Sequence, residues 1–378
     1  MTGRILSVLA IVSFCAPAGD AAGIIIDHND TDITSLSEAA INNAKAKLHI
    51  AYGHTSHGSQ LIDGMNGLIG FANAGGLGLS LPDDIFAWNN GGSGGALDLH
   101  DRAMGGDVGY YPQWVNNTTN YLNNPSYSDV NVIVWSWCGQ VSGKYASGTL
   151  NSEYLTPMTT LETAYPDVTF IYMTGHVDHW DDTNNKAANQ AVRDYCAANG
   201  KVLYDFADIE SYDPDGVYYE FPHDNCDYYA SLGGPKLGNW ATEWRSSHTE
   251  DVDWYDCGSA HSDALNANQK AYAAWALWTA IADTGRPMGD TNYDGQVDDS
   301  DYMNFVAQFG GPTGPESADF NDDGSVDLED FAIMRSNFDS GAGAPLSENS
   351  NHPIPEPVTL TLITTCLPLL LKLRRRRS

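Results

Sequence analysis

The segment Lys47-Leu-His-Ile-Ala-Tyr-Gly53 runs directly into His54-Thr-Ser-His-Gly58. Its first part has the length and apolar content of a buried strand, and its second part is typical of a tight turn. Apolar residues then recur at the spacing of one helix face, at Leu61, Met65, Leu68 and Ile69. We therefore expect a helix capped by Ser59. Ligands bind at the carboxyl ends of parallel strands, beside helix N-termini, so this turn should carry a functional site.

Further apolar runs of strand length alternate with helical segments. Strands are expected at residues 130–136, 168–173 and 201–204, and helices at residues 155–164, from a cap at Asn184 to Ala198, and from a cap at Asn266. The last helix should be buried on one side, by Tyr272, Trp275, Trp278 and Ile281. This alternation predicts an α/β fold with a doubly wound, mostly parallel sheet covered on both faces. Residues 72–128 and 210–258 show little periodicity.

The charge of the chain excludes one large class of partner. The 378 residues carry a formal net charge of −31 at pH 7. A surface this acidic repels phosphate backbones, so we expect no nucleic-acid binding.

The two ends and the cysteines indicate export. Residues 1–23 combine a cationic start, an apolar run and small residues, which is typical of a secretory signal peptide. Four cysteines lie between the terminal segments, at Cys138, Cys196, Cys226 and Cys257. An even number suits an oxidising compartment, and among the three pairings that sequence leaves open we favour Cys226 with Cys257.

Polar and ionisable residues gather at the predicted carboxyl ends of several strands. These residues are His54, Ser56, His57, Gln140, His176, His179, Asp205 and Asp208, and His261 precedes the closing helix. Convergence from separate strands points to one site.

In this arrangement residues 24–285 resemble the SGNH, or GDSL-like, hydrolase superfamily. The resemblance implies a flavodoxin-like sheet and an esterase in which Ser56 is the nucleophile and His261 the base. Asp256 is the nearest residue to orient His261, although the family has a shorter spacing between the two, and Asp253 is the alternative. The family's Gly-Asp-Ser motif is here His54-Thr-Ser56.

The same resemblance implies two donors to the oxyanion, Gln140 in place of the family's asparagine and Gly92 in place of its glycine. A serine nucleophile needs a neutral imidazole and such donors to act near neutral pH. The resulting prediction is an exported serine ester hydrolase, a carbohydrate acetyl esterase acting on a polysaccharide or another acylated substrate.

Two alternatives belong to other functional classes. The same fold can bind a surface glycan or a protein without catalysis. His54, His57, His176 and His179 form two His-x-x-His pairs after two strands, which is compatible with a metal-dependent hydrolase.

The region after the α/β domain carries a repeated calcium loop. Oxygen ligands stand at the loop positions that calcium requires, with glycine at the sixth position in both copies. The expected ligands are Asp290, Asn292, Asp294, Gln296, Asp298 and Asp301 in the first copy, and Asp319, Asn321, Asp323, Ser325, Asp327 and Asp330 in the second. With one exiting helix per loop, residues 286–340 resemble a type I dockerin domain, a small all-α module. The resemblance implies calcium as cofactor and a cohesin-like partner.

The final segment resembles a sorting signal. After a linker at residues 341–353, residues 354–378 contain Pro355-Glu-Pro357, an apolar run and a basic end. This order resembles a PEP-CTERM signal, which implies processing by an exosortase; a permanent anchor is the alternative. Either way we expect an exported protein at the cell surface or outside the cell, held at least transiently by this segment.

Overall fold

The computed structural model describes residues 23–311, 313, 317–321 and 323–338. The predicted signal peptide (apart from Gly23), linker and sorting signal lie outside these residues. Seven strands form one sheet in the order β1-β7-β6-β5-β2-β4-β3, and every neighbouring pair is parallel. They are β1 (Ile25–Ile26), β2 (His49–Gly53), β3 (Trp88–Asn89), β4 (Leu97–His100), β5 (Val132–Trp135), β6 (Thr169–Met173) and β7 (Val202–Tyr204). The predicted α/β fold with a parallel sheet is confirmed.

The direction of travel through the sheet reverses at β2. From β2 the chain passes to β3 at the edge and then to β4 on one side, and it returns to β5 on the other side before it continues to β6 and β7. Gly53 at the end of β2 pairs with Trp135 at the end of β5. The segments that leave these two strands therefore start side by side and diverge, which is where doubly wound sheets form their binding crevice.

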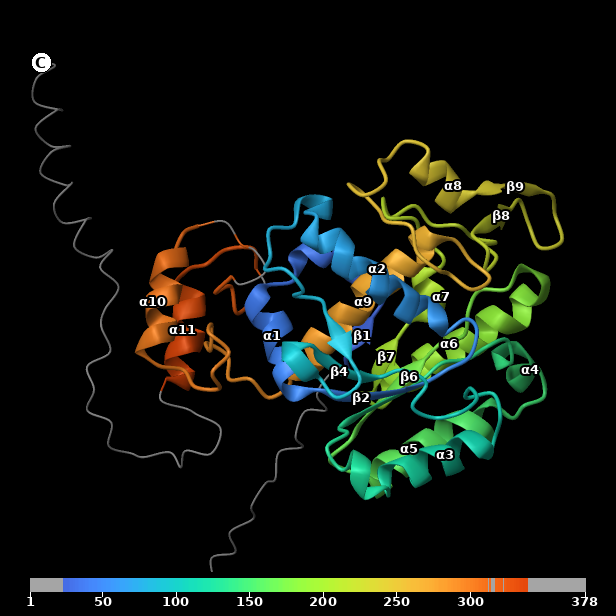
Figure 1. Cartoon of the computed structure of the whole chain (residues 1–378), viewed down its shortest axis with the longest axis horizontal. Helices are drawn as coiled ribbons and strands as arrows, with labels where there is room; N and C mark the ends of the chain where they lie inside the picture. Colours follow the sequence, from blue (N-terminus) through green and yellow to red (C-terminus); the bar gives the residue numbers. More distant parts are fainter. Residues whose placement is uncertain (1–22, 312, 314–316, 322, 339–378) are drawn as a thin grey trace, which may run out of the picture.

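Helices cover both faces of the sheet (Figure 1). One face carries α1 (Glu38–Lys47), α2 (Ser59–Asn73) and α9 (Ala264–Asp283), and the other carries α3 (Gln113–Leu122), α5 (Thr156–Ala164) and α6 (Asp182–Ala198). Successive side chains of β2 point to opposite faces of the sheet. Ile50 and Tyr52 therefore belong to the core on the first face, and Ala51 belongs to the core on the second. The shorter helices are α4 (Val141–Ala146), α7 (Phe206–Ile209) and α8 (Trp240–Arg245).

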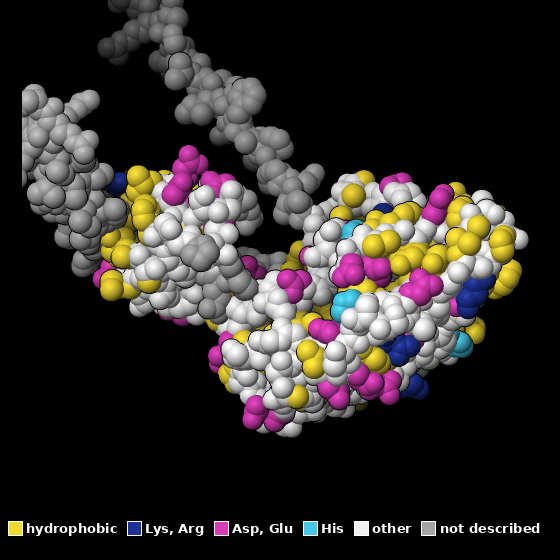
Figure 2. All heavy atoms as spheres, turned by 90° about the horizontal axis from the view of Figure 1, so that it is seen from above, with side chains coloured by type: hydrophobic (Ala, Val, Ile, Leu, Met, Phe, Trp, Pro, Cys, Tyr) yellow, Lys and Arg dark blue, Asp and Glu magenta, His cyan; other side chains and the backbone are white. Residues whose placement is uncertain are grey.

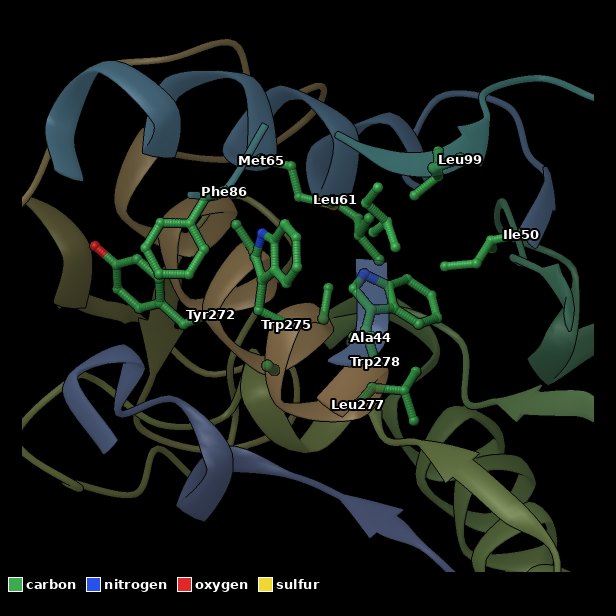
Figure 3. Close-up of a cluster of buried hydrophobic side chains, with 14 of the residues drawn as sticks. Ala44, Ile50, Leu61, Met65, Phe86, Leu99, Tyr272, Trp275, Leu277 and Trp278 are labelled. Atoms are coloured by element: carbon green, nitrogen blue, oxygen red, sulfur yellow. The ribbon is translucent and has the colours of Figure 1, made fainter. Parts of the chain in front are cut away.

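The closing helix α9 supplies the largest side chains of the first core. Figure 3 shows Trp275 and Trp278 projecting among Leu61 and Met65 of α2 and Ala44 of α1. The buried face predicted for this helix is therefore confirmed.

The predicted caps of α9 and α2 are wrong. Helix α9 begins two residues before Asn266 and is capped by Asp263, whose carboxylate accepts a hydrogen bond from the Leu265 N–H. Ser59 is the first residue of α2, and its hydroxyl donates to the Ser56 carbonyl at 2.8 Å instead of capping the helix.

Residues 210–258 form an insertion beside the carboxyl edge of the sheet. It contains an antiparallel hairpin of β8 (Asp227–Tyr229) and β9 (Lys236–Asn239), followed by α8. Cys226 and Cys257 are free thiols, as are Cys138 and Cys196, so the expected disulfide is not formed. Instead the Cys226 thiol contacts the Ser262 hydroxyl at 3.4 Å.

The calcium-loop region forms two helices, α10 (Asp299–Gln308) and α11 (Leu328–Asn337), around a small core of their own. This core contains Val297, Tyr302, Phe305, Val326 and Met334. Among the described residues, no helix has the length and apolar character needed to cross a bilayer. Figure 2 shows acidic side chains spread over the visible face and basic ones in only a few places, as the composition predicts.

Candidate functional site

His57 lies at the centre of a group of ionisable side chains beyond the carboxyl ends of β2, β5 and β6. Its Nδ1 atom is 3.7 Å from the Sγ atom of Cys138, which follows β5. Its Nε2 atom is 3.1 Å from the Oδ2 atom of Asp224, which lies in the insertion before β8. A thiol, an imidazole and a carboxylate thus form one continuous chain at the point where the sheet reverses direction.

Two further imidazoles lie against His57. The ring of His176, which follows β6, is parallel to it at a centroid distance of 3.9 Å and an angle of 3°. The ring of His261 stacks on His57 at 4.5 Å and 18°. His261 has a φ of 66°, a left-handed conformation that costs a non-glycine residue about 1–3 kcal/mol.

The electrostatics suit His57 to act as a base. Burial lowers the pKa of His57, although its hydrogen bond with Asp224 acts in the opposite direction. Burial by itself raises the pKa of Asp224, but the hydrogen bond with His57 and the nearby His223 outweigh burial, so this pKa is lowered. The imidazole is therefore neutral and the carboxylate charged at neutral pH. In this state Nε2 carries the proton that Asp224 accepts, and the Nδ1 lone pair faces the thiol.

The backbone around Cys138 presents two adjacent donors. The N–H groups of Cys138 and Gly139 both donate to the Oε1 atom of Gln140, at 3.2 and 3.1 Å. His176 lies close to Gly139, and its Nδ1 atom is 2.7 Å from the Val177 carbonyl. Two N–H groups that converge on one oxygen beside a nucleophile have the geometry that stabilises an oxyanion.

The turn after β2 is held by two carboxylates from the segment that follows β4. The Thr55 hydroxyl donates to Asp107 at 2.8 Å, and the Nε2 atom of His54 is 2.6 Å from Asp101. These contacts fix the backbone that carries His57.

A buried ion pair supports the loop after β6. Glu210 accepts a hydrogen bond from the Val177 N–H at 2.7 Å and pairs with the ammonium group of Lys270 on α9. Both side chains are almost completely buried, and burial lowers the pKa of Lys270. Removing one partner would leave a buried charge uncompensated, so the pair ties the His176 loop firmly to α9.

Among the described residues, no hydrogen bond joins the three catalytic residues that the sequence predicts, Ser56, His261 and Asp256. Ser56 is exposed on the turn, and in the described chain no hydrogen bond joins its hydroxyl to an imidazole. His261 is close to His57 and Asp224. Within the described residues neither Asp256, which is exposed, nor Asp253, which accepts from the Thr249 N–H at 2.7 Å, bonds to His261.

The two predicted oxyanion donors, Gln140 and Gly92, do not lie together. Gln140 lies beside Cys138, but it presents its amide oxygen as an acceptor. Gly92 contacts Asp98 near the start of β4, and Asp98 pairs with His49 at the start of β2. Gly92 therefore lies by the opposite end of these strands from His57.

The four histidines of the metal alternative do not meet in one place. Both nitrogens of His54 face oxygen atoms, of Thr55 and Asp101. His179 is buried and stacks on Tyr229 at 3.8 Å, with no partner for either nitrogen among the described residues. Only His57 and His176 lie together.

Sequence reasoning missed Cys138 and Asp224 as site residues. Cys138 follows a predicted strand, which is the same signal that singles out Gln140, but a cysteine in an exported chain with three others also fits a disulfide. Asp224 lies in the aperiodic insertion, where no pattern places a residue in space.

The two calcium loops have matching geometry. In the first loop the Gly295 N–H donates to Asp290 at 2.8 Å and the Asp298 N–H to Asp301 at 2.9 Å. The second loop repeats these contacts, with Gly324 to Asp319 and Asp327 to Asp330, both at 2.9 Å. Gly295 and Gly324 have φ values of 83° and 86°, which a side chain would strain.

The donor set of these loops fits calcium. Burial raises the pKa of Asp290, and the charge of the neighbouring Asp301 raises it further. Two buried, mutually repelling carboxylates are stabilised by a bound cation, and hard oxygen ligands are those that Ca²⁺ prefers. We propose the twelve residues named in the sequence analysis as the ligands of two such ions.

Comparison with known proteins identifies this module. Residues 288–339 match the family model of the dockerin type I domain. No curated protein and no solved structure matches the chain significantly. Dockerin type I domains bind calcium, and dockerin domains bind cohesin partners. Residues 288–339 of this chain are therefore a dockerin type I domain.

Proposed function

We propose that residues 24–285 are an exported hydrolase that cleaves acyl esters, and that Cys138 is its nucleophile. The observation that carries this proposal is the chain of contacts from Cys138 through His57 to Asp224 at the switch point of the sheet. A nucleophile, a base and a group that orients the base are the minimum for covalent acyl transfer.

The reaction follows from the proton positions. Nδ1 of His57 accepts the thiol proton as the Cys138 sulfur forms a bond to the ester carbonyl carbon. The tetrahedral intermediate collapses, the carbon–oxygen bond breaks, and His57 returns the proton to the departing alcohol. A water molecule, deprotonated by His57, then attacks the thioester, which releases the carboxylic acid and restores the thiol. Asp224 holds the imidazole in the required tautomer throughout.

The negative oxygen of the intermediate needs donors close to the sulfur. The Cys138 and Gly139 N–H groups meet this need once a substrate oxygen replaces the Gln140 amide oxygen that they now contact. One such donor contributes about 2.7–4 kcal/mol of transition-state stabilisation in serine hydrolases. In this proposal Gln140 keeps the donors oriented until substrate binds.

The esterase assignment with Ser56 as nucleophile and His261 as base, oriented by Asp256, is the competing proposal for the same reaction class. The position of Ser56 on the turn after β2, and of His261 before α9, still agrees with an SGNH-type relationship. We favour Cys138 because its sulfur faces an oriented imidazole.

We propose an acylated polysaccharide as substrate, an acetyl ester in the simplest case. Support comes from the dockerin domain at residues 288–339, which belongs to a class of modules that join proteins through cohesin partners outside the cell. Export by the N-terminal segment and exosortase processing of residues 354–378 belong to the same proposal. Within the part of the chain that the structure describes, His57 is bonded or stacked to imidazole, thiol and carboxylate groups and to no lysine or arginine, so the site is poorly suited to phosphate esters.

The test is hydrolysis of p-nitrophenyl acetate by the purified chain with calcium present. Cys138→Ala and His57→Gln should abolish activity, and Ser56→Ala should retain it. Loss in Ser56→Ala with retention in Cys138→Ala would transfer the nucleophile to Ser56. A folded wild-type chain without activity on any acyl ester would favour the non-catalytic binding protein.

A further inference from the structure

We propose that His57, Asp224 and His261 form a binding site for one zinc-class divalent cation, and that an ion bound there inhibits the hydrolase. The binding part stands on the geometry of these three residues. The inhibition part rests on the proposed function, because it requires His57 to be the catalytic base.

The three side chains place their ligand atoms close together. One ligand atom from each lies within 4.8 Å of the others. Two imidazole nitrogens and one carboxylate oxygen are ligands that Zn²⁺ prefers, whereas Ca²⁺ is bound by oxygen alone. Zinc is therefore the expected ion here, and calcium is expected only at the dockerin loops.

The Asp224 carboxylate has a second contact, on the oxygen that does not face His57, and this contact orients it for a cation. Its Oδ2 atom faces His57, and its Oδ1 atom lies 3.4 Å from the Nε2 atom of His223. His223 can thus hold the carboxylate from outside while Oδ2 contacts the ion. Such outer contacts typically change metal affinity about 10–100-fold when they are removed.

His261 combines a left-handed backbone with a side chain that is unbonded within the described part of the chain. Its backbone has a φ of 66°, and its exposed ring has no hydrogen-bond partner among the described residues. The ring nonetheless lies over His57 at 4.5 Å. An imidazole without a hydrogen-bond partner, beside a second imidazole and a carboxylate, is available to bind an ion that all three share. Because the two rings are 18° from parallel, the exposed ring of His261 must turn out of its stack on His57 before both nitrogens can point at one ion.

The position of the ion determines its effect on catalysis. Zinc on Nε2 of His57 displaces the proton that Asp224 now accepts, and the neutral ring carries its proton on Nδ1 instead. With Nε2 bound to the ion, a proton on Nδ1 has no other site on the ring. The imidazole then can no longer take up and return the proton of the Cys138 thiol, so acyl transfer stops.

Cys138 is not a ligand in this arrangement, since its sulfur faces Nδ1, the opposite nitrogen of His57. This distinguishes the proposed site from a simple zinc–thiolate centre. It also means that Cys138→Ala should leave metal affinity unchanged while it abolishes hydrolysis.

The experiment is calorimetric titration of Zn²⁺ into the full chain, with calcium saturating the dockerin loops. The structure predicts one zinc site whose affinity falls at least about 100-fold in His261→Gln, more than for loss of an outer contact, and about 10–100-fold in His223→Gln. Cys138→Ala should bind as the wild type does. His28→Gln and His49→Gln alter two other clusters of histidine and aspartate and are matched controls that should keep the site.

Cobalt provides a second readout that does not depend on affinity alone. The absorption spectrum of the Co²⁺ complex should lack a thiolate charge-transfer band and should be identical in Cys138→Ala. Unchanged zinc affinity in His261→Gln, a loss of affinity in His28→Gln or His49→Gln, or a thiolate band would each overturn the site.

Inhibition is then measured with p-nitrophenyl acetate. Half-inhibition should occur at the zinc concentration that half-fills the site. Zinc binding at the predicted residues without any esterase activity would refute the proposed function and leave the metal site standing. Esterase activity that persists with the zinc site filled would overturn the inhibition.

Discussion

Replacing Asp224 with asparagine should reduce kcat/KM for ester hydrolysis by about 10³–10⁴-fold. The Nε2 atom of His57 is 3.1 Å from the Asp224 carboxylate, and both side chains are mostly buried, so water cannot replace the lost charge. Loss of a hydrogen bond to a charged group alone costs about 1.5–3 kcal/mol. Loss of the correct tautomer raises the total to about 4–5.5 kcal/mol, since each tenfold change corresponds to about 1.36 kcal/mol.

The pH dependence of this variant is as informative as its rate. Burial lowers the pKa of His57, and the Asp224 charge raises it. Without that charge the pKa should fall further, so the acid limb of kcat/KM should move to lower pH. The assay is p-nitrophenyl acetate hydrolysis over the pH range in which the chain remains folded.

Asp256→Asn is the matched control, because Asp256 is the residue expected from the sequence to orient His261. Its carboxylate is exposed, and we expect activity within a few-fold of wild type. A large loss in Asp256→Asn together with a small loss in Asp224→Asn would refute the role assigned to Asp224 and restore the triad of Ser56, His261 and Asp256.

Three further predictions concern the calcium loops, a buried histidine and the core. Asp301→Ala should reduce the calcium stoichiometry measured by calorimetry from two ions per chain to one, because the second loop has its own complete donor set. Burial lowers the pKa of His179, so the unfolded chain binds more protons than the folded chain just below the usual histidine pKa of about 6.5, and stability should fall as pH drops through that range. His179→Phe should flatten this dependence and raise the free energy of unfolding by about 1–3 kcal/mol, because both buried nitrogens lack partners; an unchanged pH slope in thermal melts would contradict this. Trp275→Ala should lower the free energy of unfolding by about 3–5 kcal/mol in urea denaturation, since the indole is completely buried against Phe86; a loss below 1 kcal/mol would argue against the described core.

The strands of the sheet and the helices that cover it could be predicted because their sequence patterns are local. The apolar run before His54 and the aromatic face of the closing helix each reflect burial on one side, which periodicity reports directly. The first residue of a helix was predicted less accurately. The cap of α9 is Asp263 and not Asn266, because the Asp263 carboxylate accepts the Leu265 N–H at the start of the first turn.

The site was predicted in part for the same reason. His57, His176 and Gln140 directly follow strands, so topology alone brings them to one edge of the sheet. Asp224 reaches His57 from 167 positions away along the chain, out of an aperiodic insertion, and no local pattern specifies such a contact. Gly92 follows from the resemblance to a family whose glycine donates to the oxyanion, but its loop packs near the beginning of β4.

The central claim is that Cys138 forms the acyl intermediate. The most direct measurement is peptide mapping by mass spectrometry after rapid acid quench of the chain during p-nitrophenyl acetate turnover. We predict one acetyl group on the peptide that contains Cys138, absent in Cys138→Ala and in His57→Gln. An acetyl group on the peptide that contains Ser56, with Cys138 unmodified, would contradict the account.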